Sequence, residues 1–136
     1  MDMMKKQIIP GCIIILLALV IAAGIVSFLQ PCVHEDGTVG ACYWAGRSLL
    51  GLGLLLLALS LFAVMLQKFR AGLYLSIVIA CILGMLTPGT LISLCRMSSM
   101  RCRAVMQPAM MILFAAAGLA ALCGVAACVR KEKGKA

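Results

Sequence analysis

Four long apolar stretches without a charged residue limit what this chain can fold into. They run over residues 8–29, 48–66, 71–94 and 108–129, and none contains Asp, Glu, Lys, Arg or His. About 20 helical residues cross a bilayer, because each adds about 1.5 Å to a hydrocarbon core about 30 Å thick. The sequence therefore predicts an all-α integral membrane four-helix bundle. We expect one domain over residues 1–136, with outer loops at 30–47 and 95–107.

The composition excludes soluble classes of protein. Hydrophobic residues make up 65% of the 136 residues and charged residues 12%, whereas soluble domains average about 45–50% and about 25%. A soluble domain of this size would need more polar residues to cover its surface. We therefore exclude a soluble enzyme, a disordered tail and a nucleic-acid-binding domain. The net charge of +8 is interpreted as membrane topology, and the lipid bilayer as the first partner.

The distribution of basic residues predicts how the chain is threaded, because loops that stay in the cytoplasm carry an excess of Lys and Arg. With the N-terminus inside, the inner side holds eight: Lys5, Lys6, Lys68, Arg70, Arg130, Lys131, Lys133 and Lys135. The outer side holds four: Arg47, Arg96, Arg101 and Arg103. We therefore predict that both termini lie in the cytoplasm. Tyr43 and Trp44 then fall at the outer interface of the membrane, where such rings are favoured.

Small residues recur every four positions along the third and fourth stretches. The third stretch carries Gly72, Ser76, Ala80 and Gly84, and the fourth carries Ala116, Ala120 and Gly124. Helices in lipid associate through small residues, because these let two backbones approach closely. The two stripes predict either tight packing within the bundle or a docking face for a partner membrane protein. Further along the third stretch, Pro88 is expected to kink the helix, because proline has no N–H to donate.

Four of the eight cysteines stand where the predicted helices meet the outer loops. Cys32 ends the first helix and Cys42 precedes the second, while Cys95 ends the third and Cys102 precedes the fourth. This twofold pattern suggests the duplication of a helical hairpin in parallel topology. Four thiols in an oxidising compartment are expected to form disulfides, for which three pairings exist. We favour Cys32 with Cys42 and Cys95 with Cys102, because loop neighbours meet first.

Three hypotheses explain these outer cysteines. In the structural one, each disulfide stabilises a short loop by about 2–4 kcal/mol. In the redox one, a cysteine pair accepts electrons from a client thiol and passes them onward. That layout is similar to the disulfide-forming quinone oxidoreductases of bacterial membranes, which have four helices and two outer cysteine pairs. Here nine and six residues separate the paired cysteines, so the chain departs from the Cys-x-x-Cys of that family's first loop.

In the third hypothesis the outer loops bind a soft metal ion. Thiolate and thioether groups are ligands that Cu(I) prefers. The candidate ligands are Cys95, Met97, Met100, Cys102 and, from the first loop, His34.

Residues for other chemistry are scarce in this sequence. The only acids are Asp2, Glu35, Asp36 and Glu132, so no paired-carboxylate site, phosphate loop or Ser-His-Asp set can be built. We therefore expect no cofactor and no catalytic site apart from the redox alternative. The favoured function is a non-catalytic accessory subunit of a larger membrane assembly, with another membrane protein or a second copy as partner.

Certain residues resemble a known family. They are the opening Lys-Lys-Gln-Ile-Ile-Pro-Gly, the pair Cys32 and Cys42, and the segment Cys95-Arg-Met-Ser-Ser-Met-Arg-Cys102-Arg. They resemble an uncharacterised group of small bacterial membrane proteins, the domain of unknown function 4418, over nearly the whole chain. In the first loop Gly40 stands where Met would complete a second Met-x-Cys. The resemblance implies no activity. It implies a bacterial cytoplasmic membrane and an association with ABC-type transporters.

Overall fold

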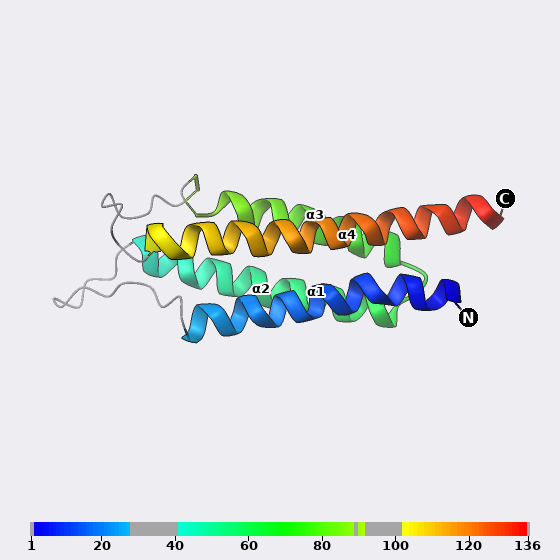
Figure 1. The fold of residues 1–136 in the computed structure, drawn as a ribbon, viewed down its shortest axis with the longest axis horizontal. Coiled ribbons are helices and arrows are strands. Elements are labelled where there is room, and N and C mark those ends of the chain that lie inside the picture. Colours follow the sequence, from blue (N-terminus) through cyan, green and yellow to red (C-terminus); the bar gives the residue numbers. More distant parts are fainter. Residues whose placement is uncertain (1, 28–40, 89, 92–101, 136) are drawn as a thin grey trace.

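The computed structural model describes residues 2–27, 41–88, 90–91 and 102–135. They form four helices, α1 (Asp2–Ser27), α2 (Ala41–Met65), α3 (Arg70–Leu86) and α4 (Gln107–Lys135), with a π-helical segment, η1 (Cys102–Met106), leading into α4. The all-α, four-helix fold is confirmed (Figure 1). Among the described residues, three segments are long and apolar enough to cross a membrane: Ile8–Ser27, Tyr43–Met65 and Ala104–Lys135.

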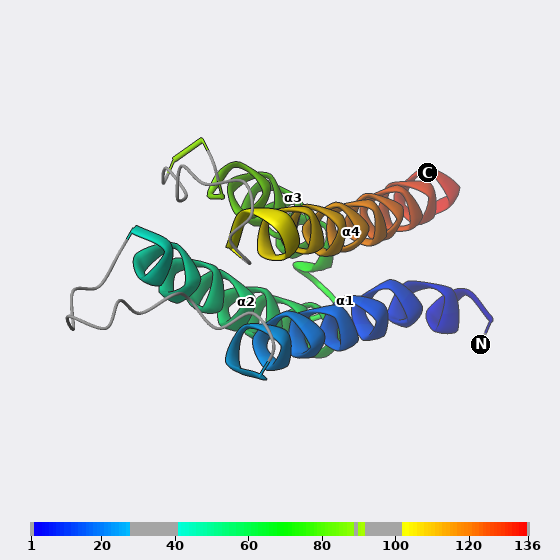
Figure 2. The same ribbon diagram turned by 60° about the vertical axis from the view of Figure 1, so that its left-hand side comes forward.

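The helices pack as two antiparallel pairs. α1 packs on α2 and α3 packs on α4, while α1–α4 and α2–α3 contacts join the pairs into a four-sided bundle. Figure 2 shows α1 and α2 in one layer and α3 and α4 in the other. Both ends of the chain lie at the same end of the bundle (Figure 1), which we call the terminal end. Two helices extend beyond the predicted apolar stretches: α2 begins at Ala41, and α4 continues through the basic tail to Lys135.

The buried residues of each helix alternate at spacings of three and four. In α1 they include Ile14, Ala18, Ile21 and Ile25, and in α4 they are Met110, Phe114, Ala117, Ala121 and Gly124. An average spacing of 3.5 residues keeps one seam of a helix facing its neighbour, as in left-handed coiled coils and most membrane bundles. The core is therefore a set of such seams, and it runs the length of the bundle.

α3 ends earlier than the sequence suggests. We expected a kinked helix through residue 94, but α3 ends at Leu86 and Thr87 is its C-cap. Both the backbone N–H and the side-chain hydroxyl of Thr87 donate to the Leu83 carbonyl, at 2.9 and 2.7 Å. Pro88, which is fully buried, cannot donate the next backbone hydrogen bond, and its ring excludes a helical carbonyl four residues earlier. The proline thus stops this helix instead of kinking it.

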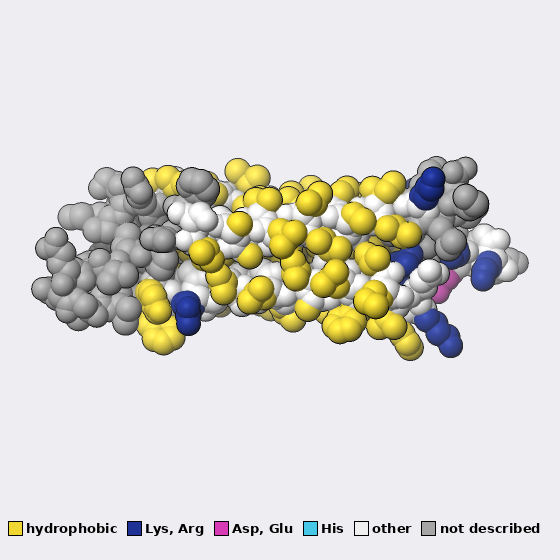
Figure 3. Space-filling view, turned by 90° about the horizontal axis from the view of Figure 1, so that it is seen from below, with side chains coloured by type: hydrophobic (Ala, Val, Ile, Leu, Met, Phe, Trp, Pro, Cys, Tyr) yellow, Lys and Arg dark blue, Asp and Glu magenta, His cyan; other side chains and the backbone are white. Residues whose placement is uncertain are grey.

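The lateral surface of the bundle is apolar. Exposed leucine, isoleucine and valine side chains occur on all four helices, and Figure 3 shows them covering the middle of the molecule. Basic side chains gather at the terminal end in the same view. This distribution matches a protein whose middle lies in hydrocarbon, with charged residues at the membrane surface.

Candidate functional site

Two of the four outer cysteines predicted as a site fall outside the described residues. Cys32 and Cys95 lie outside them, as do His34, Met97 and Met100 of the predicted metal site. The backbone of Cys42 lies in the first turn of α2, and Cys102 begins η1. Both helix starts lie at the end of the bundle opposite the termini (Figure 1). Disulfide pairing, redox activity and metal binding at these residues therefore stay predictions.

Aromatic and basic side chains meet at the start of α2, near Cys42. The rings of Tyr43 and Trp44 pack edge to face with centroids 5.9 Å apart. The Arg47 guanidinium carbon lies 5.9 Å from the centroid of the Tyr43 ring. Trp44 is 60% exposed. Aromatic rings with a polar atom favour the boundary between lipid and water, so this cluster is suited to that boundary at the end opposite the termini.

α3 and α4 interlock through two reciprocal contacts between a glycine and an aromatic ring. A Cβ atom added to Gly84 would lie 2.5 Å from the Phe114 ring, and one added to Gly124 would lie 2.9 Å from the Tyr74 ring. Each helix thus supplies one ring and one glycine that receives the partner's ring. Both aromatic side chains are fully buried. Close approach of this kind is the reason why small residues are enriched where membrane helices meet.

The predicted stripes of small residues only partly coincide with this interface. Ala80, Gly84 and Gly124 are buried, and Ala120 packs against the core, whereas Gly72 and Ser76 are exposed. Ala116 is half-buried. The reason is geometric, since each step of four residues advances about 40° beyond a full helical turn. Three such steps carry the stripe about 120° around α3, from the surface at Gly72 to the core at Gly84.

A different face of α3 points away from the rest of the bundle. We define the α3 outer face as the exposed residues Gly72, Ser76, Ile79 and Leu83. A Cβ atom added to Gly72 would meet nothing within 4 Å. The Ser76 hydroxyl donates to the Gly72 carbonyl at 3.0 Å, so a backbone acceptor of the same helix satisfies it. This face is therefore apolar, and the small side chains of Gly72 and Ser76 leave its N-terminal part flat.

Arg70 is the residue whose position the sequence did not predict. Counted above as an inner-surface charge, it is 4% exposed. Its Nε donates to the Ala63 carbonyl at 2.9 Å and its Nη2 to the Val64 carbonyl at 3.3 Å. The carbonyls of a last helical turn lack partners within the helix, and a cation there also interacts favourably with the helix dipole. The first residue of α3 therefore caps the C-terminus of α2.

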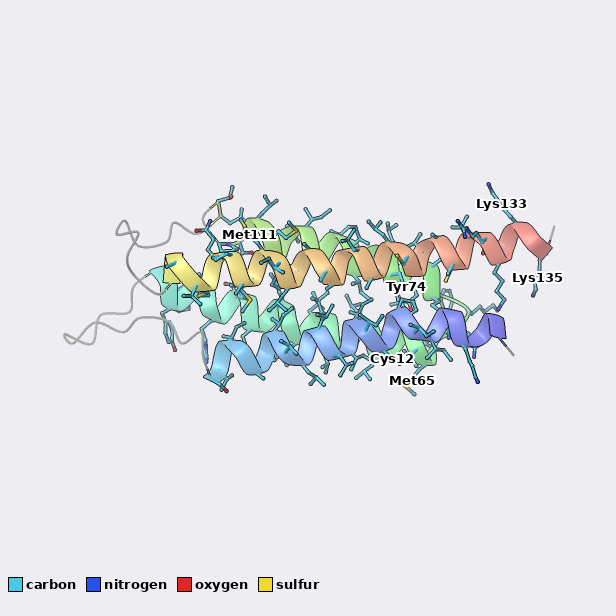
Figure 4. All side chains as sticks on the ribbon, viewed as in Figure 1. Cys12, Met65, Tyr74, Met111, Lys133 and Lys135 are labelled. Atoms are coloured by element: carbon cyan, nitrogen blue, oxygen red, sulfur yellow. The ribbon has the colours of Figure 1, made fainter. Side chains whose placement is uncertain are left out.

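Tyr74 lies one turn after Arg70 and connects three helices. It points from α3 toward α1 (Figure 4), where a Cβ atom added to Gly11 would lie 3.1 Å from its hydroxyl oxygen. Its ring covers Gly124 of α4. The sequence offered a signal for this pair, since Arg70 is the only arginine in the chain that is followed four residues later by a tyrosine. The spacing is not decisive by itself, because basic residues such as Arg70 also mark the cytoplasmic side of a membrane protein.

An apolar helical bundle with three membrane-length segments and an apolar lateral surface defines the chain as a helical membrane protein. The chain belongs to the family of the domain of unknown function 4418 (DUF4418), whose family model matches residues 14–130. The match covers most of α1, all of α2 and α3, and α4 as far as Arg130. No curated protein and no solved structure matches the chain. The expected family is thus confirmed.

Proposed function

We propose that this protein is a non-catalytic accessory subunit of a larger membrane assembly, with the α3 outer face docked against a transmembrane helix of a different membrane protein. The observation that supports it is the exposure of Gly72 and Ser76 on that face. Small residues on a lipid-facing surface let a second backbone approach closely. Within the bundle, by contrast, α3 uses Gly84 and Ala80 for contacts.

The length of α3 supports the same proposal. Its 17 residues span about 25 Å at 1.5 Å per residue, less than the hydrocarbon core of about 30 Å. A helix too short for the bilayer is accommodated by local thinning or by association with other helices. Docking of the α3 outer face against a longer helix would shield the ends of α3 from this mismatch. We propose that the assembly resides in a bacterial cytoplasmic membrane, with both termini inside, and that an ABC-type transporter is the candidate partner.

The test compares two glycines that have the same local surroundings but lie on different helices. Gly72 on α3 and Gly51 on α2 are both exposed, and a Cβ atom added to either would meet nothing within 4 Å. Gly72→Leu is expected to reduce co-purification of the partner in mild detergent at least about tenfold, because the side chain blocks backbone approach. Gly51→Leu should leave recovery unchanged. A monodisperse monomer without a stoichiometric partner, or equal losses in both variants, would contradict the proposal.

The positions of Cys42 and Cys102 favour a second candidate, a membrane thiol–disulfide oxidoreductase. Both residues begin helical segments at the end of the bundle opposite the termini (Figure 1), so one cysteine of each predicted pair lies there. In this proposal a disulfide of the protein accepts two electrons from a client dithiol, which becomes a disulfide, and a quinone reoxidises the resulting thiols. Cys102→Ser should then trap or abolish a mixed disulfide with the client.

The matched control for this redox test is Cys123→Ser. Cys123 is an exposed cysteine in the middle of α4, and its replacement should leave client oxidation unchanged. Unchanged client oxidation in Cys102→Ser and in Cys95→Ser would exclude the oxidoreductase.

A further inference from the structure

A polar hollow lies at the terminal end of the bundle, between the α2–α3 turn and the last turns of α4. Its volume is about 180 Å³. It is lined by Gln67, Lys68, Arg70, Ala71, Cys128, Lys131, Glu132 and Lys135. A water molecule takes up about 30 Å³ in the liquid, so the hollow has room for a group of several heavy atoms. Its residues come from three parts of the chain that only the folded bundle brings together.

The lining of the hollow is strongly basic. It contains four basic side chains, those of Lys68, Arg70, Lys131 and Lys135, and a single acidic one, that of Glu132. Basic pockets of this kind between the ends of membrane helices bind the phosphate-bearing head groups of anionic lipids. The excess of positive charge in this hollow therefore favours an anion.

Two features fix part of this charge in place. Arg70 is almost fully buried, and its bonds to the Ala63 and Val64 carbonyls hold the guanidinium at the floor of the hollow. In addition, the N-cap of α3, Phe69, makes no side-chain hydrogen bond to the helix, and the first residues of α3, Arg70 and Ala71, line the hollow. Backbone N–H groups at the start of a helix favour phosphate oxygens.

The hollow also lies at the depth of a lipid head group. Ala71 begins one apolar stretch and Cys128 stands near the end of another, so the apolar part of the bundle begins at its floor. Exposed lysines of α4 form its outer side. A lipid phosphate lies at this boundary between hydrocarbon and water.

We propose that this hollow binds a phosphate group, and that its source is the head group of an anionic phospholipid in the leaflet at the terminal end. The lysines would bind the phosphate oxygens, and Arg70 would act as a positioning residue whose charge is held by the end of α2. Net negative lipids such as phosphatidylglycerol are then preferred over zwitterionic phosphatidylcholine.

The test uses the purified full chain in detergent, with bound phosphatidylglycerol and phosphatidylcholine counted by native mass spectrometry. The variant Lys68→Ala/Lys131→Ala/Lys135→Ala removes three charges from the hollow, and all three side chains are exposed. The matched control, Lys5→Ala/Arg130→Ala/Lys133→Ala, removes three exposed charges near the same end that do not line the hollow. Lys133 and Lys135 extend from opposite sides of α4 (Figure 4).

The expected result is a loss of phosphatidylglycerol affinity of about fivefold per hollow lysine, or on the order of 100-fold for three. The control variant with three substitutions should change this affinity by less than about fivefold. Both triple variants should unfold at the same temperature as the parent protein. If inorganic phosphate binds, loses affinity on replacement of the three hollow lysines, and lipid does not bind, then the hollow is a phosphate site but its ligand is soluble and the lipid source is wrong. Equal losses in the two triples, or equal binding of the two lipids, would overturn the proposal.

Discussion

The two helix pairs of this bundle are held together in different ways. α3 and α4 interlock through rings placed against glycines, Phe114 against Gly84 and Tyr74 against Gly124. α1 and α2 meet mainly through aliphatic side chains, and their glycines face methyl groups: a Cβ atom added to Gly53 would lie 3.1 Å from a methyl group of Ile21, and one added to Gly11 would lie 2.8 Å from a methyl group of Val64. A buried ring has no room to move, whereas a methyl group can shift by a few tenths of an ångström. The α3–α4 pair should therefore be the part less tolerant of change.

The largest effect is expected at Gly84. Gly84→Val adds side-chain atoms where a Cβ alone would lie 2.5 Å from the Phe114 ring, and overpacking of this kind costs about 3 kcal/mol. The free energy of unfolding of the purified protein, measured by denaturant titration in detergent, checks it. Gly72→Val on the same helix is the control, since nothing lies within 4 Å of an added Cβ there. Adding Phe114→Leu to Gly84→Val should recover part of the loss, and a failure to do so would contradict the contact.

A smaller effect is expected at Arg70, which joins the two pairs. Arg70→Gln removes the bonds to the Ala63 and Val64 carbonyls, and bonds from charged groups contribute about 2 kcal/mol. The stability of Arg70→Lys should lie between that of the parent and that of Arg70→Gln, because an ammonium group cannot donate in the planar fork of a guanidinium. Thermal unfolding in detergent measures both. The exposed Lys68 of the same turn is the control, and Lys68→Gln should have little effect; equal effects at the two positions would show that Arg70 caps nothing.

The smallest losses in the free energy of unfolding are expected for two Gly→Ala variants, one in each helix pair. Gly124→Ala places a Cβ 2.9 Å from the Tyr74 ring, and Gly53→Ala places one 3.1 Å from the Ile21 methyl group. We expect a loss of about 1 kcal/mol for the first and a few tenths for the second, since only the methyl group can yield. The same titration measures both. If Gly53→Ala is the more destabilising variant, the proposed difference between the pairs is wrong.

The fold class was predictable because membrane spans follow from apolar length and charge alone. Helix ends and contact faces were less predictable. Pro88 ended α3 where a kink was expected, since whether neighbours can satisfy the freed backbone groups depends on tertiary packing. The stripe from Gly72 to Gly84 crosses from the surface to the core, because a step of four residues drifts around a helix of 3.6 residues per turn. Only residues at alternating spacings of three and four stay on the face that contacts the neighbouring helix.

The site was predictable only in part, for a different reason. Arg70 is one of two basic residues between the second and third apolar stretches, and the sequence alone does not distinguish a solvated side chain from one folded back onto α2. The hollow combines the α2–α3 turn with the end of α4, about 60 residues apart in the chain, so its charges assemble only on folding. The prediction of both termini at one end, by contrast, needed nothing beyond an even number of spans.

Docking of the chain on a different membrane protein through the α3 outer face is tested most directly by photo-crosslinking in native membranes. A photoreactive residue is placed at Ser76 on that face or, as the matched position, at the exposed Ala58 on α2. Docking through the α3 outer face predicts one crosslinked membrane protein from Ser76 and none from Ala58. Crosslinks from Ser76 to lipid alone, or only to a second copy of this chain, would contradict it.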